Sequence, residues 1–129
     1  MTRRQEIERI IIGTLLGDFP TYYPVCRNLV TDTMFSDDYL KELYTTMKDM
    51  DEEGIEVDVQ SVIERKDIFI GQEAAKLCEL ATEWSFLHKK VCYNMNIELF
   101  DKTGKKPYTE VQFEDYVRRF IYLSLSEVA

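Results

Sequence analysis

The residues best suited to chemistry in this sequence are one histidine, three cysteines and a dense group of carboxylates. His88 and Cys92 stand four positions apart, which places both on one face of a helix and is a possible spacing for metal ligands. A complete site needs two further ligands, and Cys78 is the only other soft candidate. A nucleophilic Cys–His or Ser–His pair has no local signature here. We therefore predict no metal site and no catalytic residue, with His88 an ordinary surface or half-buried side chain near two lysines.

The loops that bind nucleotide phosphates are absent from the sequence. Gly104-Lys105 is the only Gly-Lys pair, and Leu99 stands where a P-loop requires its first glycine. The pattern G-x-G-x-x-G does not occur either. We therefore predict no bound cofactor and no ATP hydrolysis by this chain alone.

Carboxylates crowd one segment of the chain. Between Asp37 and Asp58 nine acids stand against two lysines, so this segment carries a net charge of −7 of the −8 on the whole chain. The plain interpretation is a solvated helix face, and the functional interpretation is a docking surface for a basic partner. The residues of this candidate acidic surface are Asp49, Asp51, Glu52, Glu53 and Glu56.

The same charge balance argues against nucleic acid as the main partner. Phosphate binding needs clustered cations, whereas Lys89-Lys90 and Arg118-Arg119 are short and separate. Direct nucleic-acid binding is therefore a minor hypothesis.

The length and the apolar runs define the broad class of the protein. A chain of 129 residues corresponds to about one domain. The longest early apolar run, residues 10–16, is far shorter than the roughly 20 residues of a membrane span, and no signal peptide precedes it. Three cysteines without C-x-x-C spacing favour a reducing cytoplasm over a disulfide framework.

Helical spacing dominates the pattern of apolar residues. Thr2 and Gln5 have capping-box spacing ahead of a helix expected over about 3–16. Ser36 is the expected N-cap of a helix that Gly54 ends, and Asp58 is the expected N-cap of the next. Further helices are expected at about 22–29, 72–84 and 109–128. We predict one compact, orthogonal all-α domain over 1–129 with about six helices; alternation in 91–99 leaves a short hairpin near 91–108 open.

The expected C-terminal helix has a broader apolar face than a core-facing helix needs. Such a face usually marks an interface, so we predict a dimer or higher oligomer. The alternative is that this helix packs at the centre of its own domain. The predicted interface residues are Val117, Phe120, Ile121, Leu125 and Val128.

An ordered set of motifs runs through the first half of the chain. It reads Glu6-x3-Ile10-x2-Gly13-x-Leu15-Leu16, then Phe35, then Leu43-Tyr44 and Met47, then Gly54-x2-Val57-Asp58 with Val62. Over about 5–64 this set resembles the N-terminal domain of the DnaB-type bacterial replicative DNA helicase. The segment 86–112 has no counterpart in that pattern and is a possible insertion.

The resemblance implies a non-catalytic protein-interaction and oligomerisation domain in DNA replication. Domains of this kind form dimers within a ring collar and contact primase or a helicase loader. A full-length parent protein would be an ATP-dependent helicase, whose ATPase half lies outside this chain. The alternative is a small stand-alone helical protein that binds nucleic acid or regulates another protein.

Overall fold

A computed structural model of the chain describes residues 2–66, 75–81 and 109–126. Within these ranges the elements are helices, without any strand, so the all-α prediction is confirmed. The predicted hairpin near 91–108 and most of the possible insertion 86–112 lie outside the described residues. The helices are α1 (Arg3–Gly17), α2 (Phe19–Cys26), the short 3-10 helix η1 (Asp32–Met34), α3 (Asp38–Glu52), α4 (Val59–Arg65), a helix over 75–81, and α6 (Thr109–Ser126).

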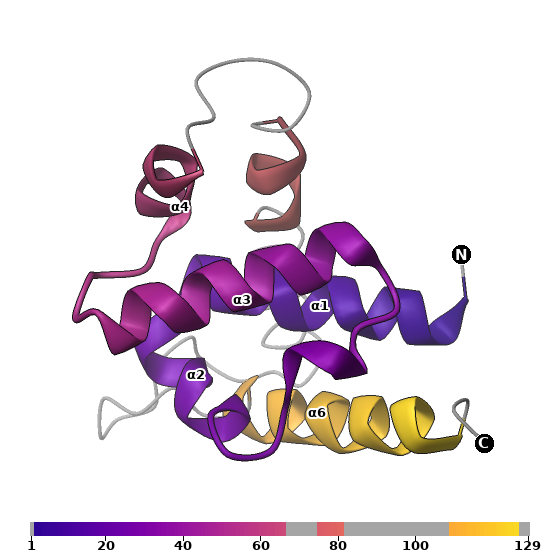
Figure 1. Cartoon of the computed structure of the whole chain (residues 1–129). Coiled ribbons are helices and arrows are strands. Elements are labelled where there is room, and N and C mark those ends of the chain that lie inside the picture. The colour runs from indigo at the N-terminus through magenta and orange to yellow at the C-terminus, as the bar shows by residue number, and fades with distance from the viewer. Residues whose placement is uncertain (1, 67–74, 82–108, 127–129) are drawn as a thin grey trace, which may run out of the picture.

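The first helix, α1, lies at the centre of the bundle. It packs against α2, α3 and α6, and Figure 1 shows α6 running antiparallel beside it. Every residue of 11–16 is buried as a result. A helix covered on all sides needs an apolar sequence all round, which explains why this stretch carries no charge.

The N-terminus of α1 has the predicted capping box. The Thr2 hydroxyl accepts from the Gln5 amide at 3.2 Å, and the Thr2 amide donates to the Gln5 side chain at 3.0 Å. The next helix, α2, begins at Phe19, three residues before the predicted start. Pro20 explains the earlier start. Proline is favoured in the first turn of a helix, because its missing amide proton would have no hydrogen-bond partner there.

A chain of aromatic rings links the helices through the core. Phe120 of α6 lies 4.8 Å from Phe35, which lies 5.1 Å from Tyr44 of α3. Tyr44 in turn lies 6.5 Å from Tyr23 of α2, between ring centroids. These rings are buried, so removal of one would leave a large cavity and cost about 3–5 kcal/mol.

The C-terminus of α3 ends in a Schellman motif at the predicted glycine. Gly54 has φ +77°, its amide donates to the Asp51 carbonyl at 3.1 Å, and the Ile55 amide donates to the Met50 carbonyl at 2.9 Å. Asp58 then caps α4, as predicted, by accepting from the Ser61 amide at 2.7 Å.

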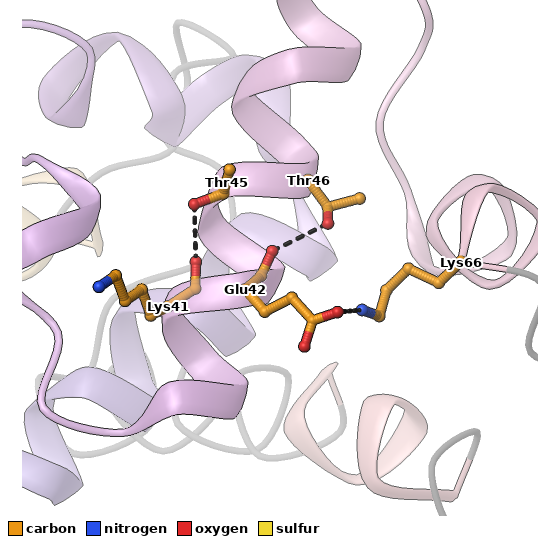
Figure 2. A network of polar contacts seen from close by, with 5 residues as sticks. All are labelled: Lys41, Glu42, Thr45, Thr46 and Lys66. Atoms are coloured by element: carbon orange, nitrogen blue, oxygen red, sulfur yellow. Dashed lines mark hydrogen bonds and ion pairs between the residues drawn. The ribbon is translucent and has the colours of Figure 1, made fainter.

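A polar network shown in Figure 2 joins α4 to the middle of α3. The Lys66 ammonium, just after α4, donates to the Glu42 carboxylate of α3 at 2.5 Å. Thr45 and Thr46 donate back to carbonyls one turn earlier in α3, which satisfies their hydroxyls within the helix. The Lys66–Glu42 ion pair is therefore the contact in this network that links the end of α4 to α3, since the threonine bonds lie within α3.

Candidate interaction surfaces

The acidic surface lies at the C-terminal end of α3 and on the segment that follows it. Two of its carboxylates have cationic partners: Asp51 lies 3.8 Å from Arg27, and Glu53 lies 2.7 Å from Arg65. These pairs are exposed, so each contributes no more than about 1 kcal/mol.

The other three residues of this surface, Asp49, Glu52 and Glu56, are exposed. In the part of the chain that the structure describes, none of them forms an ion pair. The structure thus gathers five carboxylates at one end of the bundle and leaves a net negative charge there.

The predicted interface on α6 needs a correction. Val117 and Phe120 are buried in the core of this same chain, because α6 packs against α1, α2 and η1. Phe113, at the start of the same stripe, meets Tyr22 edge to face with ring centroids 5.0 Å apart. Val117 and Phe120 therefore cannot contact a second copy in this fold, and the alternative of a centrally packed helix holds for these two residues.

Of the remaining predicted residues, Ile121 is half-buried and Leu125 is 68% exposed, while Val128 lies outside the described residues. Tyr122, which is not among the predicted interface residues, is 71% exposed. Two large apolar side chains therefore face solvent on the last turns of α6. The sequence spacing does distinguish Tyr122 and Leu125 from the buried face. Val117, Phe120 and Ser124 follow one another at three- and four-residue steps, which places these three on a single face of the helix.

A hollow of about 380 Å³ lies beside this exposed end of α6. Arg3, Arg118, Arg119, Tyr122 and Leu123 line it. Arg119 forms an ion pair with Asp115 at 2.9 Å, and Arg118 approaches Glu114 at 3.9 Å. The two clusters of opposite charge therefore belong to different elements: carboxylates at the end of α3, and arginines around the start of α1 and the middle of α6.

Glu8 is a structural residue that sequence reasoning missed. Its carboxylate is buried within α1 and accepts from both the amide and the hydroxyl of Ser36, the hydroxyl at 2.6 Å. These bonds turn the Ser36 hydroxyl towards α1, and Asp37 caps α3 instead by accepting from the Leu40 amide at 3.0 Å. The signal was present, because Glu8 stands on the helix face of Ile11 and Ile12.

Two other polar groups of the core have pKa values that burial raises. Burial raises the pKa of the Cys26 thiol to about 12, which leaves very little reactive thiolate at neutral pH. Burial also raises the pKa of Tyr44, whose hydroxyl donates to the Val30 carbonyl at 2.8 Å. Both groups stabilise the fold as neutral side chains.

Within residues 2–66, 75–81 and 109–126, no three His, Cys, Asp or Glu side chains are grouped so that they could hold a metal ion. His88 and Cys92, which the sequence analysis considered together, lie outside these ranges. In the same described ranges, no helix combines the length and the apolar character needed to cross a membrane.

The described residues form a small all-α domain. Its distinctive features are two surface regions, the acidic surface and the exposed apolar end of α6. The chain belongs to the family of the DnaB-like helicase N terminal domain, whose model matches residues 1–98. No curated protein and no solved structure matches the chain. The family makes this chain a replicative-helicase domain, as the motifs of the first half predicted. The helix α6 lies beyond the matched residues, yet it completes the core that α1 begins.

Proposed function

We propose that this chain is a non-catalytic interaction and oligomerisation domain of a replicative DNA helicase. Family membership supports the helicase context. The single observation that carries the oligomerisation role is the exposed apolar end of α6, where Tyr122 and Leu125 are 71% and 68% exposed. Large apolar side chains that lie together on a surface favour burial against another protein.

In this proposal, the self-association surface consists of the outer face of the last turns of α6. Tyr122, Leu125 and the half-buried Ile121 form it, with Val128 retained from the sequence prediction. The interface is isologous, which means that each copy contributes the same surface. Two identical helix ends that meet about a two-fold axis bury the same apolar side chains on both copies. Val117 and Phe120 contribute indirectly by holding α6 on α1.

Sedimentation velocity tests this surface. At about 50 μM, far above a micromolar dissociation constant, we expect the wild-type chain to sediment as a dimer or larger species. Leu125→Glu is expected to give a folded monomer, because it places a charge in the interface but leaves the core intact.

Leu29→Glu is the matched control, since Leu29 is also largely exposed, at 54%. It follows α2 and lines a hollow with Glu114 and Arg118 in the first half of α6, not at the last turns of that helix. This variant should associate like the wild type. A monomeric wild-type chain, or equal association of the two glutamate variants, would contradict the proposal.

The acidic surface is the proposed docking site for a second protein of the replication machinery, a primase or a helicase loader. Its five carboxylates and the absence of ion pairs at Asp49, Glu52 and Glu56 among the described residues favour a basic partner. Exposed charges of this kind mainly accelerate association and select the partner.

A second candidate function, direct nucleic-acid binding, rests on the hollow beside α6. Three arginines and Tyr122 line it, which is the combination of cations and an aromatic face that binds single strands. The net charge of −8 opposes this role. A labelled single-stranded oligonucleotide distinguishes the two, since binding that weakens steeply with salt and is lost in Arg119→Ala would favour the second candidate.

A further inference from the structure

A second hollow, of about 280 Å³, lies at the edge of the acidic surface. One face of α2 forms one wall with Phe19, Tyr23 and Pro24, and Ile55 and Glu56 after α3 form the opposite wall. Its volume falls just below the roughly 300–1,000 Å³ of small-molecule sites. The hollow therefore suits one large side chain better than a cofactor.

The walls of this hollow are held in place before anything binds. The rings of Phe19 and Tyr23 stack with their centroids 4.5 Å apart and their planes at 16°. On the other side, the Schellman motif fixes Ile55, which is 43% exposed. A preformed apolar surface lowers the entropy lost on binding, because few side chains must be ordered.

Charge around the hollow is mainly negative. Asp51 and Glu56 line it, and Arg27 is the cation among its described lining residues. Arg27 lies over the Tyr23 ring, 5.4 Å from its centroid, and reaches Asp51 at 3.8 Å. Because this ion pair is long and exposed, a cation from another protein can compete for Asp51.

The field of these carboxylates extends to the aromatic wall. The pKa of Tyr23 is raised, first by burial and then by the negative charge of Asp51, while Arg27 opposes the shift and Glu52 adds to it. Negative charge therefore acts directly on a ring that lines the hollow, besides acting at the rim.

We propose that this hollow binds a segment of a partner protein that carries one large apolar side chain between lysines or arginines. The inference rests on the proposed docking role of the acidic surface and adds the place and chemistry of the anchor. The apolar side chain fills the space between Tyr23 and Ile55, and the flanking cations pair with Glu56 and Glu52. An acidic segment is excluded by repulsion from the same carboxylates.

Fluorescence anisotropy with three labelled hexapeptides tests the proposal at low salt. The probe Lys-Lys-Leu-Trp-Lys-Lys combines an apolar centre with cationic flanks and is expected to bind. Lys-Lys-Gly-Ser-Lys-Lys lacks the anchor and is expected to bind about tenfold more weakly, the loss expected for an apolar side chain left in water. Glu-Glu-Leu-Trp-Glu-Glu has the wrong charge and is expected not to bind.

Two pairs of variants locate the binding site of the first peptide. Ile55→Ser should weaken binding about fivefold, whereas Leu29→Ser removes an exposed aliphatic side chain that does not line this hollow and should leave binding unchanged. Glu56→Gln should weaken binding about twofold, whereas Glu6→Gln changes the net charge equally in the first turn of α1 and should not.

The outcomes separate the anchor from the docking surface. If Glu56→Gln weakens binding but Ile55→Ser does not, or if the Gly-Ser peptide binds as well as the first, the hollow is not the anchor site and the acidic docking surface stands. If no peptide binds, or if both variants match their controls, the hollow and the docking role both fail. The self-association of α6 is judged separately, by sedimentation.

Discussion

At the scale of single residues, the buried carboxylate of Glu8 makes a polar contact between α1 and the segment just before α3. It accepts two hydrogen bonds from Ser36, which stands 28 positions further along the chain. A buried charge is tolerated only with such hydrogen bonds, so each partner depends on the other. Glu8 therefore anchors the segment that leads into α3 onto α1.

We expect Glu8→Ala to lower the free energy of unfolding by about 2–4 kcal/mol, because the Ser36 amide and hydroxyl lose a charged acceptor. Glu8→Gln keeps one acceptor oxygen and should cost less. Urea unfolding measures both. Glu6→Ala, an exposed acid in the same helix, is the control and should stay within about 0.5 kcal/mol of wild type. A Glu8→Ala midpoint equal to that of the control would refute this role.

The raised pKa of the Cys26 thiol should make the free energy of unfolding fall at alkaline pH. Its pKa is raised from 9.0 to about 12 in the folded chain, so the unfolded chain loses this proton first as pH rises. The contribution of this thiol to the free energy of unfolding is fully present below pH 9.0. It is lost between pH 9.0 and about 12, with a slope of about 1.4 kcal/mol per pH unit. Tyr44 acts in the same direction.

Urea unfolding at a series of pH values checks this prediction. Cys26→Ala should show a shallower loss of stability above pH 9.0 than wild type, whatever its stability at neutral pH. Parallel curves for the two proteins would show that the thiol does not contribute.

At the scale of elements, helix ends determine the shape of the acidic surface. The left-handed Gly54 closes α3 and turns the chain so that Val57 is buried while Ile55 stays exposed. A Cβ at Gly54 would meet nothing within 4 Å, so the cost of a side chain there comes from the backbone conformation alone.

We expect Gly54→Ala to lower the free energy of unfolding by about 1–2 kcal/mol and Gly54→Asn to lower it by less, since asparagine tolerates the left-handed region better. Thermal unfolding followed by circular dichroism measures both variants. Equal midpoints for alanine and asparagine would argue against backbone strain as the cause.

At the scale of the whole molecule, the uneven distribution of charge is the dominant feature. The segment from Asp37 to Asp58 carries nine acids and two lysines, and its exposed carboxylates repel one another at low ionic strength. Three of its acids pair with Arg27, Arg65 and Lys66 from outside the segment, which relieves only part of that repulsion.

Salt should therefore stabilise this protein. Between about 20 mM and 500 mM sodium chloride we expect the thermal midpoint to rise by a few degrees, because screening weakens the repulsion among many carboxylates more than it weakens the three ion pairs. The double variant Asp49→Lys/Glu52→Lys should show a smaller rise. A midpoint that falls with salt in the wild type would mean that the ion pairs outweigh the repulsion.

Local chemistry in the sequence determined most of the helices and their ends. The capping box at Thr2, the left-handed Gly54 and the cap at Asp58 depend on residues within a few positions of each other, so the spacing alone predicts them. The family follows from the same ordered spacings. The apolar run of α1 likewise indicated burial, although not which helices would cover it.

Only the tertiary structure decided which apolar and charged groups remain available to a partner. Val117 and Leu125 share α6 and are both apolar, yet one is buried against α1 and α2 and the other faces solvent. Ser36 was displaced as a cap by Glu8, which stands 28 positions away along the chain. Such outcomes depend on contacts between distant segments, and helical periodicity reports the face of a residue but not what lies opposite that face.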